Sequence, residues 1–213
     1  MIYKDSFAQQ IAQYLLEIQA VKLSPQQPFT WTSGWKSPIY CDNRLILSYP
    51  DVRNFIFGKL KEAMFQNFPN TQSVAGVATA GIPAAAVLGH DFHLPVAYVR
   101  DKPKSHGRQN RIEGKLEKDT NCIVIEDLIS TGGSSLEAVK ALQTEGVNVI
   151  GVMALFSYGF DAAHKAFEND SYPLINLCDY QVLLEVALKE GYIASDQIQT
   201  LKAWRDAPDK WGS

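Results

Sequence analysis

The sequence predicts an α/β fold with a doubly wound, mainly parallel central sheet and a small hood built from both ends of the chain. From residue 73 onward, continuous apolar runs alternate with helical patterns, which is typical of strands buried on both faces of a parallel sheet. Residues 1–50 instead combine one helical pattern with short extended pieces, and residues 179–213 carry two helical patches. We expect one domain over residues 1–213, with a hood of about 1–50 plus 179–213 and a core of about 51–178.

The N-terminal part is expected to hold two helices separated by extended chain. Apolar residues at helical spacing predict the first helix over residues 6–20. Extended pieces follow over residues 29–42, where Gly34 and Pro38 indicate turns. The second helix is expected over residues 51–68.

Strands and helices then alternate through the core. Strands are expected at residues 73–79, 94–100, 121–128, 147–156 and 174–179. Helices are expected at residues 81–90, 132–145 and 161–168. The C-terminal helical patches are expected to pack back on the N-terminal segment.

Composition restricts the class of protein. An apolar fraction of 46%, a charged fraction of 20% and a net charge of -3 are ordinary for a globular protein and argue against a broad basic face for nucleic acid. No stretch is long and apolar enough to predict a membrane span. We therefore expect a soluble cytoplasmic protein that binds neither nucleic acid nor membrane.

Cysteines and histidines give no metal or disulfide pattern. Cys41, Cys122 and Cys178 lack paired spacing, and the latter two lie in apolar runs, so we expect them to be free and buried. The isolated histidines are expected to be surface or packing residues; they are His90, His93 and His164.

Two acids and a glycine-rich turn follow the third core strand. Glu126 and Asp127 end an apolar run, and residues 128–135 read LISTGGSS. Ligands of open α/β sheets bind at the carboxyl ends of strands, and the N–H groups of a helix N-terminus attract anions. Because carboxylates repel phosphate but accept hydrogen bonds from a diol, and can also attract Mg²⁺, the segment predicts a ribose 5-phosphate site. Side-chain donors to the anion are expected from Ser130, Thr131, Ser134 and Ser135.

This segment resembles the phosphoribosyl diphosphate (PRPP) signature of the type I phosphoribosyltransferases. The resemblance implies a fold of that type, with Glu126 and Asp127 holding the ribose hydroxyls and Asp127 acting in catalysis. It also implies Mg²⁺ as a cofactor, bound mainly through PRPP with no direct protein ligand. The implied PRPP-binding residues here are Glu126, Asp127, Leu128, Ile129, Ser130, Thr131, Gly132, Gly133 and Ser134.

A cationic segment lies between two of the expected strands. Residues 98–114 hold five of the chain's 20 Lys and Arg and few apolar residues, so we expect a mobile loop at about 100–114 that closes over an anion. The segment resembles the catalytic loop of the orotate phosphoribosyltransferases, in which Arg, three residues, Lys, one residue and His-Gly follow one another. The matching residues are Arg100, Lys104, His106 and Gly107. The resemblance implies PRPP contacts from the first three, with Lys104 and His106 acting in catalysis.

Residues 29–38, FTWTSGWKSP, resemble the hood motif of the same family, which separates it from the purine transferases. The resemblance implies that orotate is bound by Lys36, Tyr40 and Cys41 together with Ser130. It also implies a homodimer whose catalytic loop is shared across the interface.

The chain departs from the family pattern at several positions. Asp101, Ala80 and Thr32 stand where some family members have Lys. An Arg that contacts the orotate carboxylate elsewhere in the family has no counterpart in residues 157–160, which read SYGF. That carboxylate must then be bound by other groups, with Ser130, Lys36 and Arg44 as candidates.

The implied activity is transfer of the 5-phosphoribosyl group from PRPP to orotate, giving orotidine 5′-monophosphate and pyrophosphate in pyrimidine biosynthesis. Three alternatives stay open at this point. They are a phosphoribosyltransferase for another base, a PRPP-sensing regulator without catalysis, and a flavodoxin-like phosphate-binding module. The last leaves Glu126 and Asp127 without a role.

Overall fold

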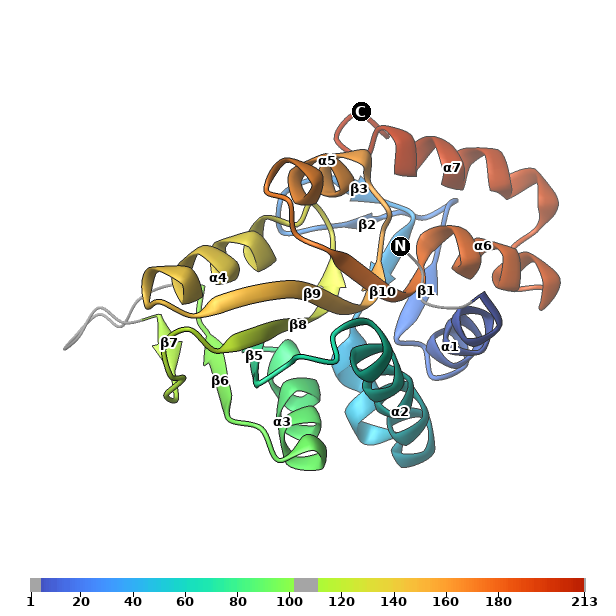
Figure 1. The fold of residues 1–213 in the computed structure, drawn as a ribbon. Helices are drawn as coiled ribbons and strands as arrows, with labels where there is room; N and C mark the ends of the chain where they lie inside the picture. The colour runs from blue at the N-terminus through green and yellow to red at the C-terminus, as the bar shows by residue number, and fades with distance from the viewer. Residues whose placement is uncertain (1–4, 102–110, 213) are drawn as a thin grey trace.

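The structure, a computed structural model, describes residues 5–101 and 111–212. Within these ranges, a six-stranded sheet runs through the centre in the order β10-β9-β8-β5-β6-β7 (Figure 1). All neighbours pair in parallel except β7, which is antiparallel to β6, so the predicted mainly parallel α/β fold is confirmed. The strands are β5 (Ser73–Val77), β6 (Val96–Val99), β7 (Ile112–Glu113), β8 (Asn121–Ile129), β9 (Asn148–Ser157) and β10 (Leu174–Asp179).

Helices cover both faces of the sheet. One face packs against α1 (Asp5–Glu17), α2 (Pro50–Asn67) and α3 (Gly81–Phe92), and the other against α4 (Gly133–Thr144) and α5 (Asp161–Asn169) (Figure 1). All five residues of β5 are buried, as expected of a strand covered on both sides. The continuous apolar runs of the sequence therefore correspond to two-sided burial.

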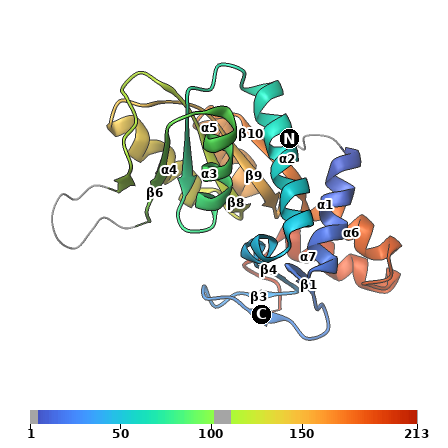
Figure 2. The same cartoon turned by 90° about the horizontal axis from the view of Figure 1, so that it is seen from below.

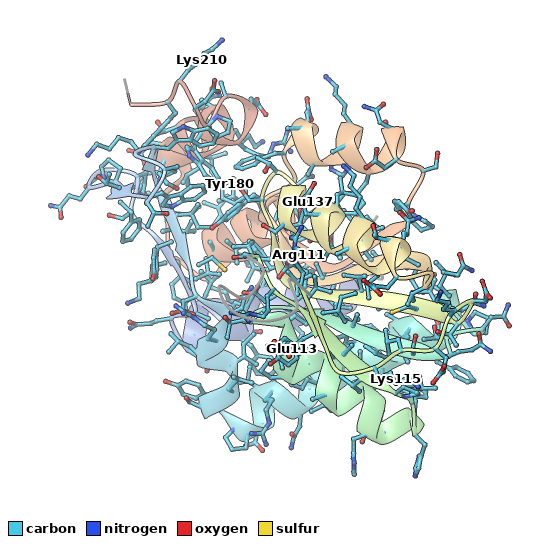
Figure 3. The ribbon with its side chains drawn as sticks, turned by 90° about the vertical axis from the view of Figure 1, so that its left-hand side faces the viewer. Arg111, Glu113, Lys115, Glu137, Tyr180 and Lys210 are labelled. Atoms are coloured by element: carbon cyan, nitrogen blue, oxygen red, sulfur yellow. The ribbon has the colours of Figure 1, made fainter. Side chains whose placement is uncertain are left out.

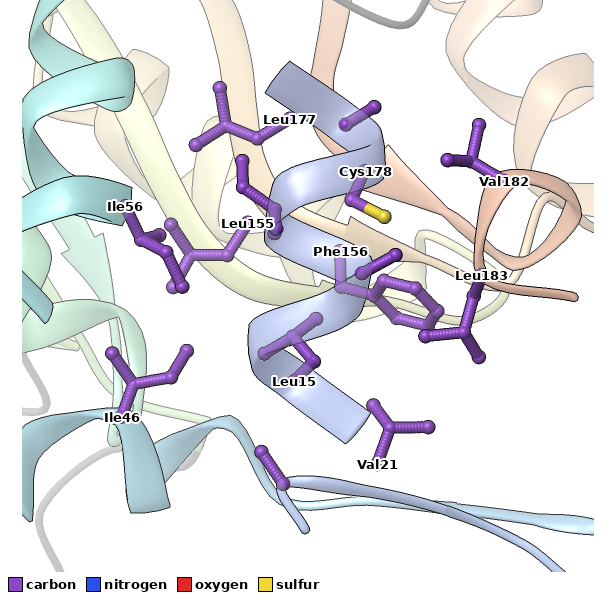
Figure 4. Close-up of a cluster of buried hydrophobic side chains, with 14 of the residues drawn as sticks. Leu15, Val21, Ile46, Ile56, Leu155, Phe156, Leu177, Cys178, Val182 and Leu183 are labelled. Carbon is purple, nitrogen blue, oxygen red and sulfur yellow. The ribbon is translucent and has the colours of Figure 1, made fainter. Parts of the chain in front are cut away.

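The larger core cluster joins the sheet to the terminal helices. Figure 4 shows Leu15 of α1 beside Phe156 of β9 and Leu183 of α6 (Tyr180–Lys189). These three side chains are at most 1% exposed. One continuous apolar core thus holds the first helix, the sheet and the C-terminal helices together.

Short elements form the segment between α1 and α2. β1 (Val21–Leu23) pairs with β4 (Ile39–Cys41), and β2 (Phe29–Thr30) pairs with β3 (Lys36–Ser37), both antiparallel. A 3₁₀ helix, η1 (Asn43–Ser48), leads into α2. Extended chain over residues 29–42 was expected, whereas β1, η1 and β7 were not.

The end of the chain returns to this segment, as Figure 2 shows. α6 packs against α1, and η2 (Ser195–Gln197) and α7 (Ile198–Asp206) complete the described chain. Beyond α7, Gly212 lies against the Lys36 side chain of β3. The two ends of the chain therefore lie together, and the division into hood and core stays a prediction.

Several expectations about single residues are confirmed. Cys122 and Cys178 are fully buried, and all three cysteines are free. The side chains of His90, His93 and His164 are exposed. In the part of the chain that the structure describes, no helix has both the length and the apolar character needed to cross a membrane.

Gly81, the first residue of α3, packs tightly against β8. A Cβ atom at this position would lie 2.3 Å from the carbonyl oxygen of Ile125. A main-chain atom cannot rotate away, so a side chain here would force α3 and β8 apart. The glycine allows the first turn of α3 to approach the strand that carries the acid pair.

Gly81→Ala is expected to destabilise the protein by about 3 kcal/mol, the upper end for overpacking of a close contact. Gly58 is the matched control, because it lies inside α2 and a Cβ there would meet no atom within 4 Å. Gly58→Ala is expected to stabilise by about 0.5–1 kcal/mol, since alanine loses less conformational entropy in a helix. Urea denaturation of the two variants measures the difference, and equal midpoints would contradict the packing argument.

Candidate functional site

The site lies where the strand order reverses. β5 and β8 are neighbours in the sheet, but the chain continues from β5 toward β6 on one side and from β8 toward β9 on the other. The helices that follow these two strands, α3 and α4, cover opposite faces (Figure 1). The carboxyl ends of β5 and β8 therefore form a topological switch point, which is where open α/β sheets bind ligands.

Glu126 and Asp127 stand next to each other near the end of β8. The Glu126 carboxylate is 6% exposed and accepts hydrogen bonds from the Asp127 N–H at 3.1 Å and from the Ser135 hydroxyl at 3.1 Å. The Asp127 side chain is half-buried. Burial raises the pKa of both carboxyl groups, and the neighbouring Asp127 charge raises that of Glu126 further. The pair is thus held in a setting that favours a bound cation, a shared proton or hydroxyl donors.

The Ser135 hydroxyl was expected to serve a bound anion, and that expectation was wrong. Ser135 is 1% exposed, and its hydroxyl donates to Glu126 inside the protein. The bond instead ties the first turn of α4 to the end of β8.

The turn between β8 and α4 leaves a helix N-terminus open. Gly132 precedes the helix with a φ of +84°, and a Cβ there would lie 2.9 Å from the Phe167 ring. No side chain within the described ranges caps this N-terminus, and the first N–H groups of a helix have no carbonyl partner inside it. Free N–H groups and the helix dipole make this turn electrostatically favourable for an anion, beside the acids.

A second helix N-terminus lies next to it. α3 begins at Gly81, in contact with Ile125 of β8, and its N-cap residue Ala80 makes no side-chain capping bond to the described chain. Ala80 is the position at which some family members have Lys. Two anion-attracting turns therefore flank the acid pair, on neighbouring strands.

A cleft of about 500 Å³ opens between the β2–β4 segment and the end of β8. Aromatic rings dominate its wall, together with hydroxyl groups. Its lining residues are Thr30, Trp31, Thr32, Ser33, Trp35, Tyr40, Cys41, Leu128, Ser130, Thr131 and Tyr158. A flat, polar-edged ring of the size of a pyrimidine suits such a wall.

The cleft brings together most of the residues predicted to bind orotate. Tyr40, Cys41 and Ser130 all lie on its wall. The Lys36 ammonium is not part of the wall but donates to the Thr30 hydroxyl, which is, at 2.7 Å. The Arg44 guanidinium makes two bonds to the Asp42 carboxylate, at 2.7 and 2.8 Å, whereas Lys36 donates directly to a residue of the cleft wall.

Tyr158 is a cleft residue that the sequence did not single out. Its backbone N–H donates to the Ile129 carbonyl, and its ring stacks on Trp31 with centroids 5.2 Å apart and an interplanar angle of 25°. Its hydroxyl has no hydrogen bond within the described parts of the chain. One signal in the sequence could have found it, because Tyr158 lies in the stretch where the family Arg is missing.

The two ends of the cationic segment are anchored by ion pairs. Arg100 lies 3.4 Å from the Glu113 carboxylate, and Arg111 lies 3.2 Å from that of Glu137 on α4 (Figure 3). The backbone N–H of Arg100 donates to the backbone carbonyl of Arg111 at 2.8 Å, so the two described ends of this segment lie side by side. The predicted catalytic residues Lys104 and His106 lie outside the described residues.

This fold, with an acid pair and two open helix N-termini at the switch point, has the chemistry that a phosphorylated, hydroxyl-bearing ligand requires. The phosphoribosyl transferase domain family matches residues 47–182, and the chain belongs to that family. Its curated relatives point to one branch of this family, the orotate phosphoribosyltransferases. The orotate phosphoribosyltransferase of Listeria innocua is 51% identical over 97% of this chain and 99% of its own length. That of Bacillus subtilis is 50% identical over 93% and 92%.

Solved structures agree with this placement. The orotate phosphoribosyltransferase of Aeropyrum pernix superposes with a TM-score of 0.76 at 28% identity, covering 86% of this chain and 99% of its own. The UMP synthase of Leishmania donovani gives a TM-score of 0.77 at 26% identity, covering 94% of this chain and 42% of its own. The flavodoxin-like alternative is thereby excluded.

Proposed function

We propose that this chain transfers the 5-phosphoribosyl group of PRPP to orotate, forming orotidine 5′-monophosphate and pyrophosphate in pyrimidine biosynthesis. The proposal rests on the arrangement at the end of β8. There the acid pair is followed along the chain by an uncapped helix N-terminus, and an aromatic cleft lies beside them. Relatives named orotate phosphoribosyltransferase, aligned over nearly the whole chain, support the same reaction.

The chemistry needs positioning and charge rather than a protein nucleophile. A ring nitrogen of orotate, which has released its proton to water, bonds to the anomeric carbon as the bond from that carbon to the pyrophosphate oxygen breaks, and the electron pair of the broken bond leaves with pyrophosphate. Positive charge develops on the ribose, and Glu126 and Asp127 stabilise it while accepting hydrogen bonds from the sugar hydroxyls. The backbone N–H groups from Leu128 to Ser134 bind the 5′-phosphate.

The base is placed in the cleft by aromatic and polar groups. Ser130, Tyr40 and Cys41 lie on its wall, and Lys36 supplies the nearby positive charge for the orotate carboxylate. The Tyr158 hydroxyl is a further donor available to that carboxylate. Together these groups replace the family Arg that the chain lacks.

Mg²⁺ fits the oxygen-rich donors of this site. Across the described chain no group of three or more His, Cys, Asp and Glu side chains is arranged to hold a metal ion. Mg²⁺ keeps several waters and binds readily to substrate phosphates, so PRPP itself would supply most of its ligands, with no direct protein ligand required. The ion would neutralise the pyrophosphate, so that Lys104 and His106 act on a leaving group of reduced charge.

A homodimer is part of the proposal. Leu45 and Leu47 of η1 are 37% and 38% exposed, and Tyr49 after it is 44% exposed. Adjacent exposed apolar side chains of this kind mark interaction surfaces. Light scattering of the purified protein gives its mass in solution, and a monomer at micromolar concentration would reject the dimer.

We place the enzyme in the cytoplasm. The three free cysteines fit a reducing compartment, where disulfides rarely form. Fractionation of cells that express the protein tests this, and recovery outside the cytoplasm would reject it.

A panel of bases tests the reaction. Pyrophosphate release is measured with PRPP, Mg²⁺ and one of orotate, uracil, adenine or hypoxanthine. We expect release with orotate at least about 10³-fold faster than with the other bases, since a site built for a charged group rejects ligands that lack it. Release with another base instead would identify a different phosphoribosyltransferase, and PRPP binding without release would identify a regulator.

A further inference from the structure

Asn43 connects the base cleft to the acid pair. This residue begins η1 and is 4% exposed. Its side-chain Nδ2 donates to the carbonyl oxygen of Asp127 at 2.8 Å, across 84 positions of the sequence. Its Oδ1 accepts from the Cys41 thiol, with 3.4 Å between sulfur and oxygen. One amide group therefore joins a wall residue of the cleft to a residue that holds the ribose.

The backbone around Asn43 is fixed on both sides. The Asp42 N–H donates to the Ala20 carbonyl at 2.7 Å, beside the β1–β4 pair. The Asp42 side chain accepts from the Arg44 N–H at 3.2 Å and caps η1. Because the backbone is held before and after Asn43, its amide reaches β8 from one defined position.

Asn43 is 4% exposed and both bonds of its amide are partly shielded from water, so each is costly to lose. A buried donor or acceptor left without a partner costs about 1–3 kcal/mol. Burial, followed by the charges of Asp127 and Asp42, raises the pKa of the Cys41 thiol, so the thiol retains the proton that it donates. The arrangement from Cys41 through Asn43 to Asp127 is thus a stable connection rather than a chance contact.

We propose that Asn43 is a positioning residue that fixes the base cleft relative to the ribose-binding carboxylates, and so aligns the ring nitrogen of the base with the anomeric carbon. This inference rests on the proposed function. Reaction requires the two atoms to be held about 3–3.5 Å apart and in line, and a displacement of about 1 Å can cost about 100-fold in rate. Without Asn43, the cleft still binds the base and the carboxylates still bind the ribose. The cleft and the carboxylates are then no longer held at a fixed distance and orientation.

Substitution of Asn43 should give different results if the residue aligns the substrates than if it only stabilises the fold. A residue that only stabilises the fold changes the free energy of unfolding and leaves the kinetics of the folded protein unaltered. Asn176 on β10 is a matched control, because it is a buried asparagine, 3% exposed, in a strand outside the site. Its Oδ1 has no hydrogen-bond partner among the described residues.

The experiment compares Asn43→Ala, Asn43→Leu and Asn176→Ala. Leucine has the same branching as asparagine, with two terminal heavy atoms on Cγ, but neither donates nor accepts, so it removes both hydrogen bonds without leaving the site empty. For both Asn43 variants we expect kcat with orotate and PRPP to fall about 10- to 100-fold. Calorimetric titration with PRPP and Mg²⁺ should give a Kd within about threefold of that of the unmodified protein, since one half of the site is intact. Asn176→Ala should leave kcat unchanged.

Three outcomes would overturn the inference. They are turnover within about threefold of the unmodified protein, a loss explained entirely by weaker PRPP binding, and failure of both Asn43 variants to fold. If Asn43→Ala alone fails to fold, the kinetics of Asn43→Leu decide. The unmodified protein is assayed first, because absence of orotate-dependent pyrophosphate release from it rejects the proposed function itself, whereas an active parent with equally active variants rejects the role of Asn43 alone.

Discussion

Asp127→Asn is expected to lower kcat with orotate and PRPP about 10²–10³-fold, the range for loss of one electrostatic contact to a transition state. Asparagine retains the size of the side chain and one acceptor oxygen, so the sugar hydroxyls still find a partner. It removes the negative charge that faces the developing positive charge on the ribose. We therefore expect kcat to fall much more than the affinity for PRPP.

The same substitution should stabilise the protein at high pH. Burial raises the pKa of Asp127 and of Glu126, so ionising them is harder in the folded protein than in the unfolded chain. A raised folded-state pKa contributes stability that is present below the unfolded pKa and is lost as the pH rises through the folded value. Asp127→Asn removes one of these buried charges, so its gain in stability should be larger at pH 8 than at pH 5.

Asp179→Asn is the matched control for the two effects expected of Asp127→Asn, the fall in kcat and the gain in stability at high pH. Asp179 also ends a strand, is also buried enough to have a raised pKa, and caps α6 by accepting from the Val182 N–H at 3.0 Å. Asparagine caps helices equally well, and Asp179 lies two strands away from the acid pair, so kcat should not change. Urea denaturation at both pH values and steady-state assays give the comparison. A kcat for Asp127→Asn within tenfold of the parent would remove Asp127 from the mechanism.

Local pattern was enough to predict most of the fold. Strands such as β8 and β9 are long apolar runs because both of their faces are buried, and each is followed by a helix that starts at a glycine or an acid. Two-sided burial is a property of the strand's own residues, so it is visible in the sequence. The alternation of such strands with helices then indicates a doubly wound, mainly parallel sheet.

The missed elements depend on partners far along the chain. β1 and β7 are three and two residues long, and each exists because it pairs with another strand, β4 or β6. So short a piece carries no periodicity of its own. The same holds for Asn43, whose partner on β8 is 84 positions away, and which sequence reasoning passed over.

The candidate site was predictable in its parts but not in its assembly. The acids and the turn after β8 form one continuous segment, so their chemistry could be inferred from spacing alone. Ser135 could not be assigned correctly, because whether its hydroxyl points to a ligand or to Glu126 depends on how α4 packs on β8. Tyr158 reaches the cleft only because β9 ends beside β8, with Ser157 opposite Ile129.

Lys104→Ala is expected to lower kcat about 10²–10³-fold with little change in the affinity for PRPP or orotate. Lys104 matches the loop lysine of the orotate phosphoribosyltransferases, and its charge would meet the negative charge that grows on pyrophosphate as it leaves. That charge is largest in the transition state, so an interaction with it lowers the barrier more than it tightens ground-state binding.

The described chain on either side supports this role for Lys104. β6 runs parallel to β5 and β8, so its carboxyl end lies at the same edge of the sheet as Asp127. The segment leaves that end and rejoins the sheet through β7, where the Arg100 N–H meets the Arg111 carbonyl. The described residues on either side of this segment therefore lie at the sheet edge that carries Asp127.

Lys115→Ala is the control for Lys104→Ala. Lys115 follows β7, is 83% exposed and pairs with Glu117 at 2.7 Å (Figure 3). Its removal deletes the same charge from the same region without touching the sheet edge, so kcat should be unchanged. If Lys104→Ala retained kcat within threefold, pyrophosphate departure would have to be assisted by other groups, such as His106, Mg²⁺ and the two helix N-termini. Equal losses in both variants would instead indicate that the overall positive charge of the region matters, and not the position of one ammonium group.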